Sequence, residues 1–212
     1  VNPLAPCTDP IADNKTLTIS ETPIVDAGLD ATICEGSTYT VSDATASNYA
    51  LLLWSSSGTG TWVNINTLNP TYTPSAADIA AGSVILTLTA TNGNCPVVSN
   101  YKQLNIQHEV IVNAGADESI CEGSNATLSG ATASGYSNLF WTTSGSGSFS
   151  DITALNPDYI PSPADIAAGS VILTLTGTSS SPCSGSFTDN MNLFIRYSPM
   201  AEAGSDGLIC QG

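Results

Sequence analysis

The sequence predicts an all-β chain of tandem antiparallel β-sandwich modules in an extended array. One observation is a repeat: the run Ala77–Thr89 recurs letter for letter as Ala164–Thr176, 87 residues later. The other is the pattern within it, where alternating apolar and polar residues are separated by turn-forming Gly, Asn and Pro at short intervals. The chain must therefore be understood as an array rather than as one domain with one pocket.

The flanks of this run repeat as well and define the modules. Trp54 matches Trp141, and the segment Ala27–Gly36 matches Ala114–Gly123 and, a third time, Ala203–Gly212. We expect the chain to be a window on a longer array, divided into the C-terminal tail of a preceding module (1–20), module 1 (21–108), module 2 (109–198) and the N-terminal head of a following module (199–212).

Composition excludes several classes of function. Only 3 Lys and Arg stand against 18 Asp and Glu, a net charge of −15, which disfavours nucleic acid and anionic membrane surfaces as partners. No apolar run approaches the roughly 20 residues that span a bilayer, so we expect no membrane-embedded segment. No acid, base and nucleophile recur together, so we do not expect an enzyme. An acidic, Thr- and Ser-rich chain is typical of secreted or surface proteins.

The first elements of module 1 follow from local pattern. Residues 24–25 begin a strand that breaks at Ala27-Gly28, because glycine permits a kink that a side chain would resist, and the strand resumes over Ala31–Cys34. Residues 51–54 predict a central strand whose Trp54, like Trp141 in module 2, fills the core between two sheets. Upstream, Lys15–Ile19 alternates and predicts the closing strand of the preceding module.

The second half of the module begins at a helix signal. Ser75 and Asp78 have capping-box spacing, which predicts one helical turn over Ala76–Ala81 that ends at Gly82. A long strand follows with its even-numbered residues inward, then an Asn-Gly hairpin and a last strand over about 97–106. Seven to nine short strands of this kind predict a sandwich of immunoglobulin-like type.

Two segments also carry a resemblance to a known family. The opening Val25–Gly36 resembles the start of PKD-like and other immunoglobulin-like repeats. Together with Leu68–Val84, it resembles the tandem repeats of very large surface adhesins of Bacteroidota, including the gliding-motility adhesin. The resemblance implies export by type IX secretion, display on the cell surface, and a role in adhesion or gliding.

The cysteines occupy two fixed positions of the repeat, and with one His in the chain we expect disulfides rather than zinc. Pairing within modules, Cys34–Cys95 and Cys121–Cys183, would join opposite ends of a sandwich. Pairing of sequence neighbours would span two strands and a linker. We favour an interlocked pair, Cys34–Cys183, between modules stacked head to tail, while the other schemes stay open because they depend on the strand order. The candidates are Cys7, Cys34, Cys95, Cys121, Cys183 and Cys210.

Other candidate sites are weaker. Asp30, Asp117 and Asp206 recur in Ala-Gly-x-Asp and are candidates for calcium, although a turn-capping role explains them as well. Asp78 and Asp165 read as helix caps. Trp62, matched by Phe149, is a candidate for an exposed contact. We expect no other cofactor.

The sequence therefore predicts the structural or adhesive repeat region of a bacterial surface filament, giving reach and stiffness. One alternative is a carbohydrate-binding array of a secreted hydrolase, and another is the subunit of a self-assembling extracellular fibre. Expected partners are neighbouring modules, surface polysaccharide or other filament chains.

Overall fold

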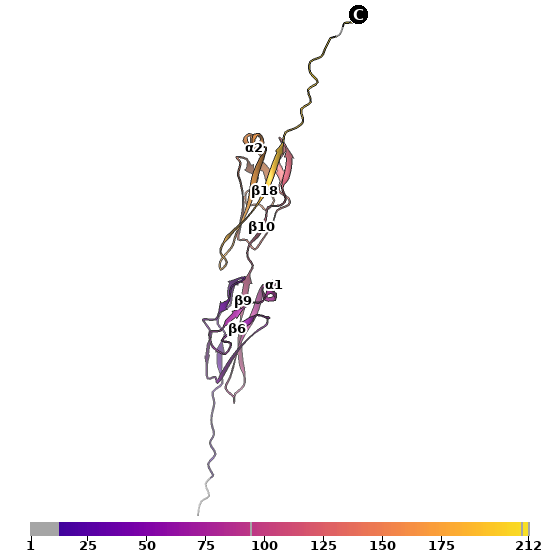
Figure 1. The fold of residues 1–212 in the computed structure, drawn as a ribbon. Helices are drawn as coiled ribbons and strands as arrows, with labels where there is room; N and C mark the ends of the chain where they lie inside the picture. The colour runs from indigo at the N-terminus through magenta and orange to yellow at the C-terminus, as the bar shows by residue number, and fades with distance from the viewer. Residues whose placement is uncertain (1–12, 94, 209, 212) are drawn as a thin grey trace, which may run out of the picture.

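The chain folds into two immunoglobulin-like β-sandwiches stacked end to end, with the chain entering at one end of the rod and leaving at the other (Figure 1). The computed structural model describes residues 13–93, 95–208 and 210–211. The predicted all-β, immunoglobulin-like class is confirmed. We call the sandwich of β1 to β9 module 1 and that of β10 to β18 module 2.

The two modules contain the same elements in the same order. Module 1 consists of β1 (Ile24–Asp26), β2 (Ala31–Cys34), β3 (Tyr39–Thr40), β4 (Thr45–Ser47), β5 (Leu51–Ser56), β6 (Thr61–Val63), β7 (Thr71–Thr73), α1 (Ala76–Ala81), β8 (Ser83–Thr91) and β9 (Val98–Gln107). Module 2 consists of β10 (Ile111–Asn113), β11 (Glu118–Cys121), β12 (Ala126–Thr127), β13 (Thr132–Ser134), β14 (Asn138–Thr143), β15 (Ser148–Phe149), β16 (Asp158–Ile160), α2 (Pro163–Ala168), β17 (Ser170–Thr178) and β18 (Ser186–Arg196).

Each module has one four-stranded sheet, in the order β2-β9-β8-β5 or β11-β18-β17-β14. The three-stranded sheet β3-β7-β6 and the pair β1-β4 complete module 1, and module 2 repeats them. Two expectations need correction. One pair per module is parallel, β2 with β9 and β11 with β18. The strand that carries Trp54 lies at an edge of its sheet, because inward burial of a side chain does not require a central strand.

The core lies between the sheets and follows the alternation of the long strands. Val84, Leu86, Leu88 and Ala90 of β8 are buried, as the period of two predicts. Trp54 and Trp141 are each 1% exposed. The indole N–H of Trp54 donates to the carbonyl of Thr67 at 3.0 Å, so this polar atom is satisfied inside the core.

The predicted helical turn is confirmed, and it holds a buried carboxylate. Ser75 caps α1 with a full capping box, and Gly82 ends it in the left-handed conformation at φ 74°. Asp78 is 3% exposed and accepts from the Tyr72 hydroxyl at 2.7 Å and from the Thr59 N–H at 2.9 Å. Burial alone would raise the pKa of Asp78, but these bonds and those from Ser75 outweigh it and hold the pKa below its usual value.

Trp62 and Phe149, the candidate surface contacts, are each partly exposed and pack against the core. The Trp62 ring is half-buried, with its centroid 4.7 Å from that of Tyr72 and 5.9 Å from that of Trp54. Phe149 makes the matching contacts with Tyr159, at 5.0 Å, and with Trp141. Because stacked aromatic rings bury apolar area against each other, both side chains close the edge of the core.

The expected strand at Lys15–Ile19 does not form. Residues 13–23 have no strand, and Leu17 and Ile19 are 82% and 86% exposed. A strand needs a neighbour for its backbone hydrogen bonds, and no strand is paired with this segment in the described structure. Residues 199–208 likewise lie outside any strand.

Candidate functional site at the junction between modules

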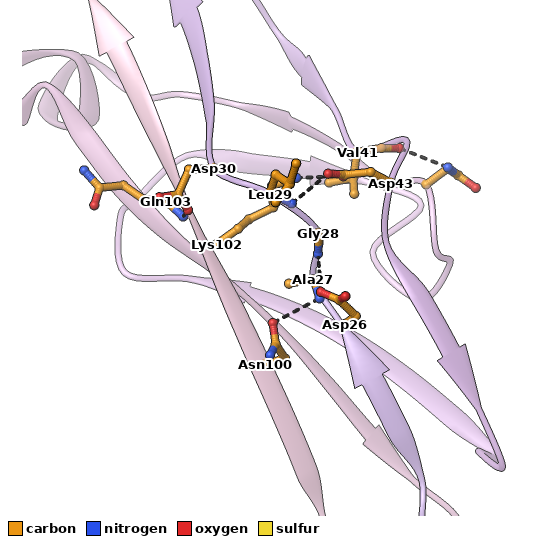
Figure 2. Close-up of polar contacts among 11 residues, drawn as sticks. Asp26, Ala27, Gly28, Leu29, Asp30, Val41, Asp43, Asn100, Lys102 and Gln103 are labelled. Atoms are coloured by element: carbon orange, nitrogen blue, oxygen red, sulfur yellow. Dashed lines mark hydrogen bonds and ion pairs between the residues drawn. The ribbon is translucent and has the colours of Figure 1, made fainter.

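A kink in the first strand brings one half of the junction into place. β1 pairs with β4 in one layer, and after Gly28, at φ 85°, the chain crosses to the other layer as β2. Figure 2 shows the side chains that hold this crossing: Asn100 accepts from the Ala27 N–H at 3.1 Å, and Asp43 accepts from the Leu29 N–H at 2.8 Å. The predicted break at Ala27-Gly28 is therefore confirmed.

The aspartate of the Ala-Gly-x-Asp motif attaches the start of β2 to the last strand. Asp30 accepts from the N–H of Gln103 at 2.8 Å, and Asp117 accepts from the N–H of Asn192 at the same distance (Figure 2 for Asp30). The hydrogen bonds from the Asn192 backbone and side-chain amide lower the pKa of Asp117. These aspartates therefore bond across to a strand more than 70 residues away, and do not cap their own turn.

The calcium expectation finds no cluster to support it. Among residues 13–93, 95–208 and 210–211, no group of three or more His, Cys, Asp and Glu side chains could hold a metal ion. Asp206, the third candidate, lies exposed in the segment after module 2.

The parallel pairing of β2 with β9 places Cys34 opposite Gln107, the last residue of β9 before the linker to module 2. Cys183 lies in the loop between β17 and β18, at the facing end of module 2. The two form a disulfide, with Cα atoms 4.9 Å apart across a sequence separation of 149 residues. We call this the junction disulfide. It is the interlocked pair, and it joins the modules covalently at a second point beside the linker.

Polar contacts surround the junction disulfide. The side-chain amide of Gln107 donates to the carbonyl of Ser180 at 3.1 Å and contacts its hydroxyl at 2.9 Å. His108 Nδ1 lies 2.8 Å from Glu35 Oε2. This hydrogen bond and one from the Glu109 N–H lower the pKa of Glu35. His108 and Glu109 of the linker are thus bonded to module 1, and Gln107 at the end of β9 bonds module 1 to module 2.

Three of the other cysteines are free thiols. In the part of the chain that the structure describes, Cys95, Cys121 and Cys210 are free. Cys7 lies outside the described residues. The within-module pairs Cys34–Cys95 and Cys121–Cys183 do not form, because each would join the two ends of a sandwich.

Sequence reasoning missed two contacts. One is the contact of His108 with Glu35, for which the place of His108 directly after the last strand and the turn residue Glu35 beside Cys34 were available signals. Lys102 was also missed: it is 1% exposed and forms an ion pair with Asp43. Its signal was its inward register on β9, two residues before the buried Leu104.

One apolar hollow on the surface has no titratable side chain in its lining. It lies along the edge strand β5 and is lined by Leu51, Leu52, Leu53, Asn66, Thr89 and Thr91, none of which titrates. No helix among the described residues is long and apolar enough to cross a membrane.

Comparison with known proteins supports the fold. No protein-family model matches the chain, and no curated protein matches its sequence. Among solved structures, EC1-2 of human mucin-like protocadherin is similar over 85% of this chain and 100% of its own, with a TM-score of 0.53 and 12% identity. DIP-gamma IG1+IG2 is similar over 84% of this chain and 99% of its own, with a TM-score of 0.54 and 11% identity. Human CDH23 EC21-23 is similar over 84% of this chain and 70% of its own, with a TM-score of 0.54 and 13% identity.

Proposed function

We propose that this chain is a structural repeat region of an extracellular adhesive filament, and that its work is mechanical. The observation that carries the proposal is the junction disulfide, because it links two modules that already lie end to end. The expectation of a bacterial cell surface, with type IX secretion and a role in attachment or gliding, rests on the sequence resemblance. The similar structures are cadherin and immunoglobulin domains, which is compatible with an adhesive role.

The disulfide changes the covalent path along which tension travels. A pull on both ends passes from Cys34 directly to Cys183, so residues 35–182 lie in a closed loop and carry no tension through the backbone. That loop would add roughly 500 Å if extended, at about 3.4 Å per residue. The disulfide therefore keeps the rod from lengthening, and the hydrogen bonds from Gln107 to Ser180 help to hold one module in its orientation to the other. Reach and stiffness are the properties that such a region supplies.

The alternative, a carbohydrate-binding array, would need a row of exposed aromatic rings. Trp62 and Phe149 instead pack against Tyr72 and Tyr159 at the edge of the core, which favours the mechanical role. We also propose that the chain is not an enzyme, since no set of acid, base and nucleophile recurs in its modules.

Single-molecule pulling on the two ends tests the proposal. In the oxidised protein, no length from residues 35–182 should be released before the disulfide breaks. In a reducing buffer, or in the Cys34→Ser variant, two module-sized extensions of about 300 Å each should appear. The Cys95→Ser variant is the matched control and should behave as the oxidised wild type. Equal extension with and without reductant would contradict the proposed function.

A further inference from the structure

The aspartate of the Ala-Gly-x-Asp motif stands at the entry to a parallel pair of strands in both modules. Asp30 precedes the β2–β9 pair, and Asp117 precedes the β11–β18 pair. We infer that each aspartate is a force-bearing residue, which slows the unfolding of its module under tension when the junction disulfide is open. This inference rests on the proposed mechanical function and names the side chains that resist force within each module.

In module 1, the aspartate side chain takes the place of a backbone acceptor. Ala31 pairs with Leu104, so Asp30 and Gln103 lie opposite each other one residue before the paired strands. The carboxylate of Asp30 accepts from the N–H of Gln103 at 2.8 Å, and both residues are labelled in Figure 2. A hydrogen bond to an ionised acceptor is stronger than one between neutral groups. The carboxylate therefore extends the ladder at the end that tension on β2 reaches first.

Module 2 makes the same contact with a different residue on the last strand. Asp117 accepts from the N–H of Asn192 at 2.8 Å, and the side-chain amide of Asn192 donates to its two oxygens at 3.1 and 3.2 Å. The bond to the backbone N–H is common to both modules, whereas the side chain opposite the aspartate changes from Gln103 to Asn192. We call the bonds of Asp30 to Gln103 and of Asp117 to Asn192 the entry latches.

The direction of the strands decides how tension acts on a latch. When the junction disulfide is open, tension enters module 1 through β1 and leaves through the end of β9. β2 is then pulled towards its N-terminal end, and β9, its parallel neighbour, towards its C-terminal end. Strands that slide past each other load all the bonds between them together, because those bonds lie across the direction of pulling. The latch at Asp30 therefore shares the load with the whole β2–β9 ladder.

The closed junction disulfide takes the latch out of the path of tension. Tension then passes from β2 through Cys34 to Cys183, and β9 lies within the closed loop. The disulfide and the latches thus form two successive barriers to lengthening. The first blocks the release of chain, and the second sets how fast each module unfolds after reduction.

Constant-force pulling on the Cys34→Ser protein tests the inference, because both modules are then loaded through their terminal strands. Asp30→Ala should make one of the two unfolding events at least about five-fold faster, since it removes a bond that breaks before the module can unfold. Asp117→Ala should accelerate one event in the same way, and the double variant should accelerate both. Asp30→Asn keeps an acceptor oxygen and should recover most of the original rate.

Asp78→Asn is the matched control for a general loss of stability. Asp78 bonds Tyr72 and caps α1, so it lies outside the β2–β9 pair. Its bonds persist while β2 slides along β9, and bonds that persist in the transition state do not change the rate of unfolding. The rate under force should therefore stay within about two-fold of that of the Cys34→Ser protein, although denaturant unfolding finds module 1 less stable.

Two results would overturn the inference. One is equal acceleration by Asp30→Ala and Asp78→Asn, which would show only a general loss of stability. The other is an unchanged rate in Asp30→Ala. Neither result contradicts the proposed function, which fails instead if the oxidised wild-type protein releases as much length as the reduced protein.

Discussion

Lys102 and Asp43 form an ion pair across 2.7 Å, with the lysine side chain fully buried and the aspartate side chain 40% exposed. Module 2 has Met191 in the place of Lys102, where it is 3% exposed, and Gly130 in the place of Asp43. One fold thus fills the same site with a partly buried ion pair in one module and with an apolar side chain in the other.

This exchange predicts asymmetric effects in module 1. Asp43→Gly leaves a buried ammonium without its counter-charge and should lower the free energy of unfolding by about 3 kcal/mol. Lys102→Met leaves only a partly exposed carboxylate without its partner, and should lower the free energy of unfolding by about 1 kcal/mol or less. The double variant has the residues of module 2 at both positions, and its free energy of unfolding should be nearer to that of the wild type than is that of Asp43→Gly alone. Denaturant unfolding measures all three, and purely additive effects would contradict the account.

The kink that positions Cys34 should depend on Gly28. An alanine there would be strained at φ 85°, and its Cβ would lie within the carboxylate of Asp43. Gly36 is the matched control, at φ 78° with open space around it. We expect Gly36→Ala to lower the free energy of unfolding by about 1 kcal/mol, from backbone strain alone. Gly28→Ala should lower it by at least about 2 kcal/mol. Thermal unfolding of module 1 gives the comparison, and equal losses would show that the crossing tolerates a side chain.

Acid should destabilise both modules through Asp78 and Asp165. Their hydrogen bonds lower the pKa of each in the folded state, despite burial. The unfolded chain therefore binds protons first, so this stabilisation is present above about pH 4 and is lost as the pH falls through the lower folded-state pKa.

The measurement is the free energy of unfolding between pH 6 and pH 2. In the variant with Asp78→Asn and Asp165→Asn, stability should be lower at pH 6 and should depend less on pH. The exposed Asp206→Asn is the control and should follow the wild type. If the free energy of unfolding of the double variant fell with pH as steeply as that of the wild type, these two carboxylates would not be the cause of the loss of stability in acid.

The fold could be predicted because its signals are local. The alternation in β8, the capping box at Ser75 and the kink glycine at Gly28 each act within a few residues. The edge position of β5 could not be predicted, since Trp54 is buried in the same way on an edge strand or a central one. The parallel pairing of β2 also needed the three-dimensional crossing at Gly28.

The junction disulfide could be predicted from the sequence for a different reason. Cys34 and Cys183 hold fixed places in a repeat, and an end-to-end stack brings those places together whatever the details of packing. The contacts of His108 and Lys102 depend on single side chains that module 2 does not repeat, so the comparison of the two modules did not indicate them, and only the local signals given above could have done so.

The most direct test of the account is non-reducing peptide mapping of the oxidised protein by mass spectrometry. The account predicts a peptide that links Cys34 to Cys183, absent after reduction. Linked peptides Cys34–Cys95 and Cys121–Cys183 would instead mean two independently closed modules, and would contradict the junction disulfide on which the mechanical function rests.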